Sequence, residues 1–309
     1  MLVDSNKMED LADSINDSME IEGRSLWEDA RSRFFKNRAA VTSLFILVAI
    51  VTFSFVGPYF SEWGYEDIDW NALSDVRELG KPSIESGHYF GTDALGRDLY
   101  NRVIQGTQIS LMVGFVGALI AVVIGTLYGA VAGYFGGRLD GFMMRTVDIL
   151  MAIPFMFFLI LLLVMFGRHI WLIFVGIGAL SWLDMSRIVR GQTLSLKNKE
   201  FIEAAVASGV SSLTIVWRHI VPNVLGVVVV YATLLVPGMI LTESFISFLG
   251  LGVQEPQTSW GALINEGAGQ LSYGTTWQLF FPLAFFVATL LSLFFIGDGL
   301  RDALDPKDR

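Results

Sequence analysis

The sequence predicts an all-α integral membrane protein with six transmembrane helices. Of its 309 residues, 53% are hydrophobic, and the mean hydropathy is +0.56. The apolar residues gather into long uncharged stretches, whereas a soluble protein disperses them. A helix needs about 20 apolar residues to cross the hydrocarbon core of a bilayer. Lys and Arg also recur in every second connection between these stretches, which is typical of a polytopic membrane protein.

Four of the uncharged stretches are long enough to span a membrane alone, and 149–167 is just long enough. The apolar run 170–183 is shorter, and we expect Asp184 and Arg187 at its interfacial end. The uncharged stretches are 39–61, 103–137, 149–167, 220–242 and 267–297. The six predicted spans are 40–60, 108–133, 143–166, 169–185, 223–248 and 278–297.

The region before the first span, 1–38, is predicted to be a cytoplasmic tail. Residues 1–23 carry seven acids and one Lys without an apolar period, which indicates disorder. From about residue 24, aromatic and aliphatic side chains recur at helical spacing among Arg and Lys, which predicts a helix in the membrane interface. The alternative is that this helix forms the first turns of span one, 39–60. The apolar members of the pattern are Leu26, Trp27, Ala30, Phe34 and Phe35.

The basic residues predict that both termini are cytoplasmic. We therefore expect an external segment at 61–102 and a core of five spans at 103–300. This core contains a long cytoplasmic loop, 186–222, and is followed by a cytoplasmic tail, 301–309. The residues on which this orientation rests are Arg24, Arg31, Arg33, Lys36, Arg38, Arg138, Arg145, Arg187, Arg190, Lys197, Lys199, Arg218, Arg301, Lys307 and Arg309.

Span two carries small residues at every fourth position. Small side chains let helix backbones approach closely, which favours association inside a lipid bilayer. The stripe therefore places this span at the centre of a bundle or at a subunit interface. Its members are Gly117, Ala121, Gly125, Gly129 and Gly133.

Proline and a few charges interrupt the spans. Pro154 and Pro237 each remove a backbone donor and predict either a gating hinge or a static bend. Asp148 follows Arg145 by three residues, so the two are expected to pair on one helix face. Glu243 is a carboxylate near the outer end of span five and a candidate for the translocation path.

Several functions are disfavoured by composition and motifs. The net charge of −9 argues against nucleic-acid binding, and the lack of Cys excludes disulfides and thiolate chemistry. The nearest approach to a phosphate loop, at Gly80 and Lys81, lacks both its first Gly and its Ser or Thr. No HExxH motif is present, and the three His residues are scattered. We therefore predict no catalytic group, no metal site and no cofactor in this chain.

The loop 186–222 contains a docking pattern. Glu203, Ala204 and Ala205 precede Gly209, and Pro222 follows. Ala205 and Gly209 are four residues apart, so they are expected to share a helix face that a partner can approach. We expect two short helices joined at Gly209, ended by the proline. The alternative is an ordinary interfacial helix between two spans.

Residues 203–222, EAAVASGVSSLTIVWRHIVP, resemble the EAA loop of ABC-transporter permeases. Residues 90–114, FGTDALGRDLYNRVIQGTQISLMVG, resemble the segment that opens the transmembrane domain of C-type oligopeptide and dipeptide permeases. ESFISFLGLGVQEPQTSWG at 243–261 and GDGLRDALDPKDR at 297–309 resemble later segments of the same family. The resemblance covers most of residues 40–309 and favours the oligopeptide branch.

This resemblance implies the type I ABC importer permease fold in the bacterial inner membrane. It implies a heterodimer with a homologous B-type permease, two ATPase subunits that bind Mg-ATP, and an extracytoplasmic peptide-binding protein. The chain would form half of a translocation path for oligopeptides and would meet the ATPases through its EAA loop. Relatives that carry dipeptides, antimicrobial peptides or nickel complexes are the alternatives. A secondary transporter acting alone is a further alternative, but the sequence has few paired intramembrane charges and no clear repeat.

Overall fold

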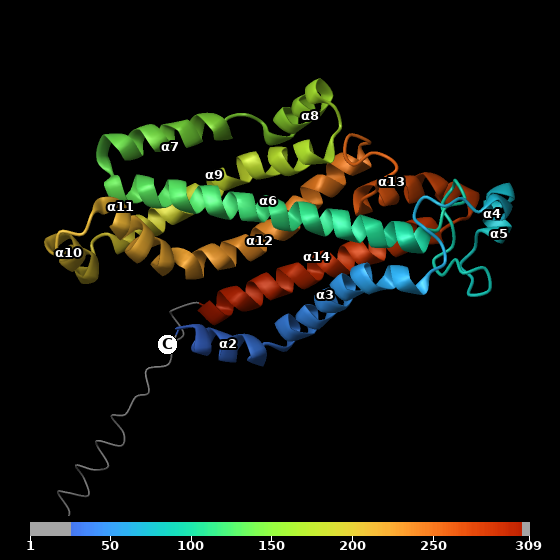
Figure 1. Cartoon of the computed structure of the whole chain (residues 1–309), viewed down its shortest axis with the longest axis horizontal. Coiled ribbons are helices and arrows are strands. Elements are labelled where there is room, and N and C mark those ends of the chain that lie inside the picture. The colour runs from blue at the N-terminus through green and yellow to red at the C-terminus, as the bar shows by residue number, and fades with distance from the viewer. Residues whose placement is uncertain (1–25, 305–309) are drawn as a thin grey trace, which may run out of the picture.

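The structure is a computed structural model that describes residues 26–304, and these residues form a bundle of long helices with short helices at both ends (Figure 1). The acidic tail predicted at 1–23 and the final residues 305–309 lie outside the described residues. The longer helices are α3 (Arg38–Val56), α6 (Leu99–Phe135), α7 (Gly137–Met151), α8 (Phe155–Phe166), α9 (Ile170–Leu196), α12 (Val221–Phe248) and α14 (Trp277–Leu304). The shorter helices are α2 (Leu26–Lys36), α4 (Trp70–Ser74), α5 (Val76–Leu79), α10 (Glu200–Ala207), α11 (Ser212–Ile215) and α13 (Trp260–Gln270).

The described residues contain five helical segments that are long and apolar enough to cross a membrane. A sixth crossing is possible if α7 and α8 count as one span, but these helices are bent by 73° at a short break. The sequence predicts a continuous span at 143–166, and the structure breaks it before Pro154, which cannot donate a helical hydrogen bond. The five segments are Arg38–Phe60, Leu99–Phe135, Ile170–Leu196, Ser212–Phe248 and Trp277–Leu304.

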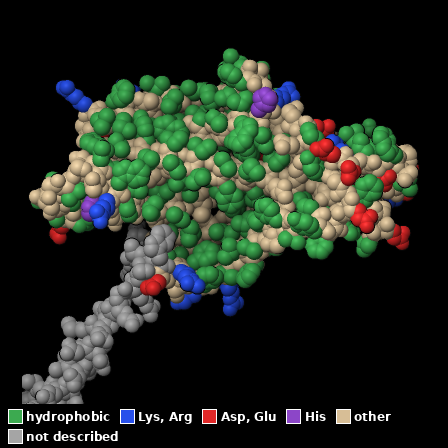
Figure 2. Space-filling model, viewed as in Figure 1, with side chains coloured by type: hydrophobic (Ala, Val, Ile, Leu, Met, Phe, Trp, Pro, Cys, Tyr) green, Lys and Arg blue, Asp and Glu red, His purple; other side chains and the backbone are tan. Residues whose placement is uncertain are grey.

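The two ends of the bundle differ in their short elements and in their charge. Helices α4, α5 and α13 lie at one end, whereas α10, α11 and α2 lie at the other (Figure 1). We call these the outer and inner ends, following the orientation that the basic residues predict. Hydrophobic side chains cover the middle of the molecule, and Asp and Glu gather near α4 and α5 (Figure 2). This distribution suits a protein whose middle part lies in the hydrocarbon core of a membrane.

Helix α6 is the central element, and it packs along α9 for much of its length. Three glycines of the predicted small-residue stripe lie against the α9 backbone. A Cβ atom on Gly125 would lie 2.8 Å from the carbonyl oxygen of Trp182, and one on Gly133 would lie 2.9 Å from that of Arg190. A Cβ atom on Gly129 would meet the carbonyl oxygen of Ser186. The α6 and α9 backbones are therefore too close for a side chain at these positions.

The outer part of the stripe contacts other helices as well. A Cβ atom on Gly117 would lie 2.8 Å from the sulfur of Met239 in α12, and Ala121 is fully buried. The stripe therefore lets α6 approach α9 along its inner half and α12 farther out.

We predict that Gly129→Ala destabilises the protein, because the new methyl group meets backbone atoms that cannot rotate away. The expected cost is about 1–3 kcal/mol, which is typical of an overpacked contact. Thermal unfolding of the purified protein in detergent measures this change. The matched control is Gly226→Ala in α12, where a Cβ atom meets nothing within 4 Å. Equal unfolding temperatures for the two variants would contradict a tight α6–α9 contact.

Candidate functional site

The predicted docking loop forms a hairpin of two short helices, α10 and α11, at the inner end. Gly209 joins them with φ +76°, a left-handed conformation that favours glycine. Ser211 then caps α11 by accepting a hydrogen bond from the backbone N–H of Thr214. This arrangement matches the two helices that the sequence predicts.

The hairpin divides the predicted docking residues between an exposed and a buried side. Glu203 and Ala204 are exposed, as is Gly209. Ala205 is only 9% exposed and packs in a cluster that includes Ile202 and Ile215. The expectation that Ala205 and Gly209 share one helix face is wrong, because α10 ends at Ala207.

The exposed side of the hairpin and of the turn that follows it, Val216–Ile220, carries large apolar side chains. Phe201, Val206, Leu213 and Trp217 are each between 43% and 62% exposed. Beside them, a hollow of about 560 Å³ lies between the α6 end and α10, and Glu203 contributes to its lining. Apolar side chains gathered on a surface, next to a hollow with a polar rim, are typical of a protein-binding site.

The hairpin continues into α12 without a break, so the prediction that Pro222 ends this segment is wrong. Residues Val216–Ile220 form a π-helical turn, in which the N–H of Val221 donates to the carbonyl of Val216. This wider turn accommodates Pro222, which has no N–H to donate. The amide of Asn223 also donates to the carbonyl of His219 at 2.5 Å. The apolar segment Ser212–Phe248 is consequently one helical rod.

Glu243, the predicted path residue, is fully buried where α12 crosses α6. Its carboxylate accepts hydrogen bonds from Ser110 at 2.9 Å, from Ser247 at 2.6 Å and from Ser244 at 3.3 Å. Ser110 in turn accepts from the backbone N–H of Trp260. Glu243 therefore links α6, α12 and the start of α13. Its part in the translocation path stays a prediction.

Pro237 lies inside α12, and its side chain is buried. The helix is assigned without interruption from Val221 to Phe248, so the proline does not break it. Its role in gating also stays a prediction.

Two ion pairs join α7 to α9. Arg190 binds Asp140 through two nitrogens, at 2.5 Å and 2.6 Å. Arg187 binds Asp148. The expected pair between Arg145 and Asp148 does not form, because the Asp148 carboxylate binds Arg187 of α9. This cross-helix pairing could not be read from residue spacing within one helix.

Charged residues at the outer end form a network that the sequence did not predict. Arg102 is 1% exposed and binds Glu266 of α13 at 3.0 Å and Asp93 at 3.2 Å. Arg97 binds Asp93 at 2.7 Å and Glu255 at 2.9 Å. These contacts fasten the loop before α6 to the segment after α12. Burial raises the pKa of Glu266, although the charge of Arg102 opposes this effect.

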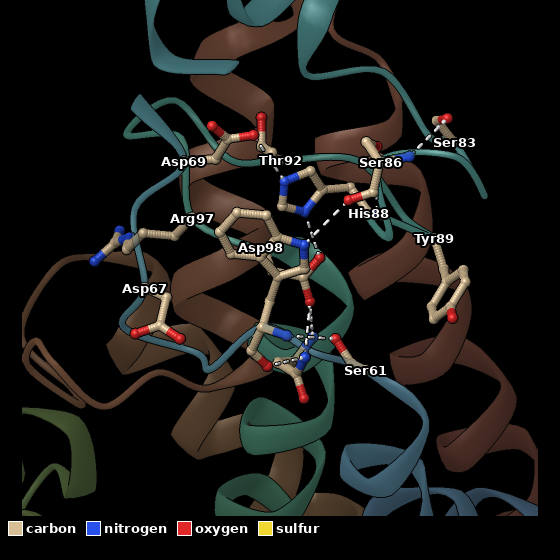
Figure 3. A network of polar contacts seen from close by, with 12 residues as sticks. Ser61, Asp67, Asp69, Ser83, Ser86, His88, Tyr89, Thr92, Arg97 and Asp98 are labelled. Atoms are coloured by element: carbon tan, nitrogen blue, oxygen red, sulfur yellow. Dashed lines mark hydrogen bonds and ion pairs between the residues drawn. The ribbon is translucent and has the colours of Figure 1, made fainter. Parts of the chain in front are cut away.

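The external segment is anchored by His88, which lies between two carboxylates (Figure 3). Its Nδ1 lies 2.9 Å from Asp98, and its Nε2 lies 3.3 Å from Asp69. Trp63 stacks on the imidazole with ring centroids 4.5 Å apart. Asp98 also caps α6 by accepting from the backbone N–H of Asn101. Both ring nitrogens can donate to carboxylates only when the imidazole is protonated.

The described residues include no group of three or more His, Asp or Glu side chains placed to hold a metal ion. The polar clusters in residues 26–304 instead join helices to one another or to the external segment. The exposed hairpin, with the hollow beside it, is the candidate functional feature.

Long apolar helices with polar links buried between them define a polytopic membrane protein. Residues 125–309 match the family described as binding-protein-dependent transport system inner membrane component, and the chain belongs to this family. Residues 25–79 match the N-terminal transmembrane domain of oligopeptide transport permease C. The chain is thus an integral protein of the bacterial inner membrane.

Curated relatives match almost the whole chain. The oligopeptide transport system permease protein OppC of Escherichia coli strain K12 is 60% identical over 305 residues, which cover 99% of each chain. OppC of Haemophilus influenzae is 58% identical over 302 residues, covering 98% of this chain and 95% of the relative. The dipeptide transport system permease protein DppC of Bacillus subtilis is 41% identical over 293 residues, covering 95% and 89%.

We predict that His88 makes the stability of the protein depend on pH. Burial alone would lower the pKa of His88, but hydrogen bonds and charges from Asp98 and Asp69 raise it above its ordinary value. The stabilisation is therefore complete below a pH of about 6.5 and is lost as the pH rises through the raised pKa. Thermal unfolding at a series of pH values should show this loss.

The variant His88→Gln should unfold at a lower temperature and lack this part of the pH dependence. His169→Gln is the control, because His169 is exposed at the start of α9. The prediction fails if the wild type and His88→Gln lose stability in parallel as the pH rises.

Proposed function

We propose that this chain is the transmembrane subunit of an ATP-binding-cassette importer for oligopeptides, in which it forms half of the translocation path. The observation that carries this proposal is the identity of 60% over 99% of both chains to an oligopeptide transport permease. Dipeptides are the second candidate substrate, favoured by the 41% identity to a dipeptide transport permease. The higher identity and coverage support the oligopeptide class.

Three kinds of partner complete the proposed importer. A homologous B-type permease forms the other half of the path, and a binding protein delivers the peptide to the outer end. Two ATPase subunits bind Mg-ATP, and one of them docks on the α10–α11 hairpin through the surface around Glu203, Ala204 and Gly209. The chain itself is not an enzyme in this scheme. The two ATPase subunits hydrolyse the ATP.

The geometry of the hairpin supports this docking role. Its outward side is apolar, and α11 is continuous with α12 through the π-helical turn and Pro222. A partner that moves the hairpin therefore acts directly on a membrane-spanning helix. An ordinary interfacial helix, the alternative considered from the sequence, needs neither the exposed apolar side chains nor this continuous joint.

We expect ATP-dependent uptake of a labelled pentapeptide into proteoliposomes that contain this chain, the sister permease, both ATPases and the binding protein. Omission of this chain should abolish uptake. Competition by unlabelled dipeptides measures the size preference. Uptake by this chain alone without ATP would overturn the proposal. Intact assembly without pentapeptide uptake would move the substrate to dipeptides or another ligand.

We predict that a cross-linker attached at Ala204→Cys captures an ATPase subunit, because this position is exposed on the hairpin. The chain has no natural Cys, so the introduced thiol is unique within it. Ala205→Cys is the matched control, since Ala205 faces the hydrophobic cluster and its thiol should react poorly. Capture of only lipid or the sister permease at Ala204 would contradict the docking role.

A further inference from the structure

Asp184 is an exposed carboxylate within a membrane-spanning helix. It lies about four turns into α9, roughly 21 Å along the axis at 1.5 Å per residue. The sequence predicts it at the interfacial end of a short span, and α9 continues for twelve residues beyond it, to Leu196. Within residues 26–304 the Asp184 side chain has no hydrogen-bond or ion-pair partner.

The two arginines that follow Asp184 on α9 are already paired. Arg187 is one turn further along α9 and binds Asp148, and Arg190 binds Asp140. Neither arginine forms an ion pair with Asp184 in the described chain. An unpaired carboxylate is costly in lipid. Asp184 must therefore face water, a partner protein or a ligand when the importer is assembled.

Asp184 lines a pocket of about 370 Å³ between the bend that joins α7 to α8, helix α9 and helix α12. This volume is within the range of small-molecule sites. The walls are largely aliphatic, and the polar side chains among the lining residues are Ser181, Asp184 and Thr242. The pocket thus offers a single charge in apolar surroundings.

The polar atoms of this pocket can accept hydrogen bonds but have no donor to offer. The hydroxyl of Ser181 donates to the carbonyl of Ile177, and that of Thr242 donates to the carbonyl of Gly238, each at 2.8 Å. Their oxygens retain lone pairs, and the Asp184 carboxylate is an acceptor. A primary ammonium group has three donors and one positive charge, so it complements this set. A carboxylate or phosphate does not.

We propose that Asp184 binds the α-ammonium group of the transported peptide, with the aliphatic walls receiving its first side chain. This inference rests on the proposed function, since it names a contact within the same translocation path. The shared chemistry is that of any primary ammonium, so a Lys of the sister permease is the competing source. The experiment below separates the two.

A unique thiol in the pocket reports on the charge of Asp184. Leu180→Cys lies one helical turn before Asp184 and lines the same pocket. In an importer whose other subunits carry no reactive Cys, we expect a trimethylammonium methanethiosulfonate to modify this thiol about tenfold faster than a sulfonate one. Adding Asp184→Asn should remove the preference. Adding Asp298→Asn, which changes an exposed carboxylate of α14 outside the pocket, should leave it intact.

Protection identifies the source of the ammonium group. A pentapeptide with a free amino terminus, added at high concentration to the detergent-solubilised importer without binding protein, should slow the modification. The same peptide with an acetylated terminus should not. A thiol that no reagent reaches in any nucleotide state would show that the pocket is closed to water-borne ligands, and the proposal would fail. Equal protection by both peptides would also overturn it.

Transport provides a second, separate measure. Asp184→Asn should lower uptake of the free-amine peptide about tenfold, the loss expected for one charge-assisted hydrogen bond, whereas Asp298→Asn should not. Asp184→Glu should restore part of the rate. Failure of the proposed function would appear as absent uptake by the wild-type importer. If the wild-type importer takes up the peptide and Asp184→Asn does so at the same rate, only the ammonium-binding role of Asp184 is contradicted.

Discussion

The close contact between α6 and α9 is the constraint on which the rest of the bundle depends. Glycines at 125, 129 and 133 bring the two backbones together, and a side chain at any of them would meet backbone or Cβ atoms of α9. Because one side of α9 is fixed against α6, its opposite side is held outward, toward α7 and α12. Asp184, Arg187 and Arg190 lie on that side. The packing of small residues thus determines where the charges of the span are presented.

A second constraint is that polar groups within the membrane need partners. Glu243 accepts hydrogen bonds from three serines, and Arg187 and Arg190 bind carboxylates of α7. Each of these groups joins two helices, so the requirement for pairing also holds the bundle together. Asp184 departs from this rule among the described residues. A departure from a rule that the rest of the bundle follows is where function is expected.

The features carried by local pattern were predictable from the sequence. Apolar stretches predicted the five unbroken spans, and the glycine at 209 predicted the joint between α10 and α11. Contacts between distant segments were not predictable, because spacing along one helix cannot tell that Asp148 faces Arg187 or that Arg102 reaches Glu266. The tendency of proline to end a helix also predicted the wrong end for the docking segment. That tendency holds for α-helical turns, whereas the π-helical turn Val216–Ile220 lets the helix continue through Pro222.

The hairpin and the Asp184 pocket are connected through the chain, because α10 and α11 adjoin α9 and α12, which line the pocket. Helix α9 leads through a short turn into α10, and α11 continues through the π-helical turn into α12. Helices α9 and α12 are also two walls of the pocket. A displacement of the hairpin is therefore shared between two walls that face each other across the pocket. A bound ATPase that moves α10 and α11 would change the distance between Asp184 and Thr242, and with it the affinity for an ammonium group. Coupling between hairpin movement and ammonium binding would then require no relay of side chains, because α9 and α12 both adjoin the hairpin and line the pocket.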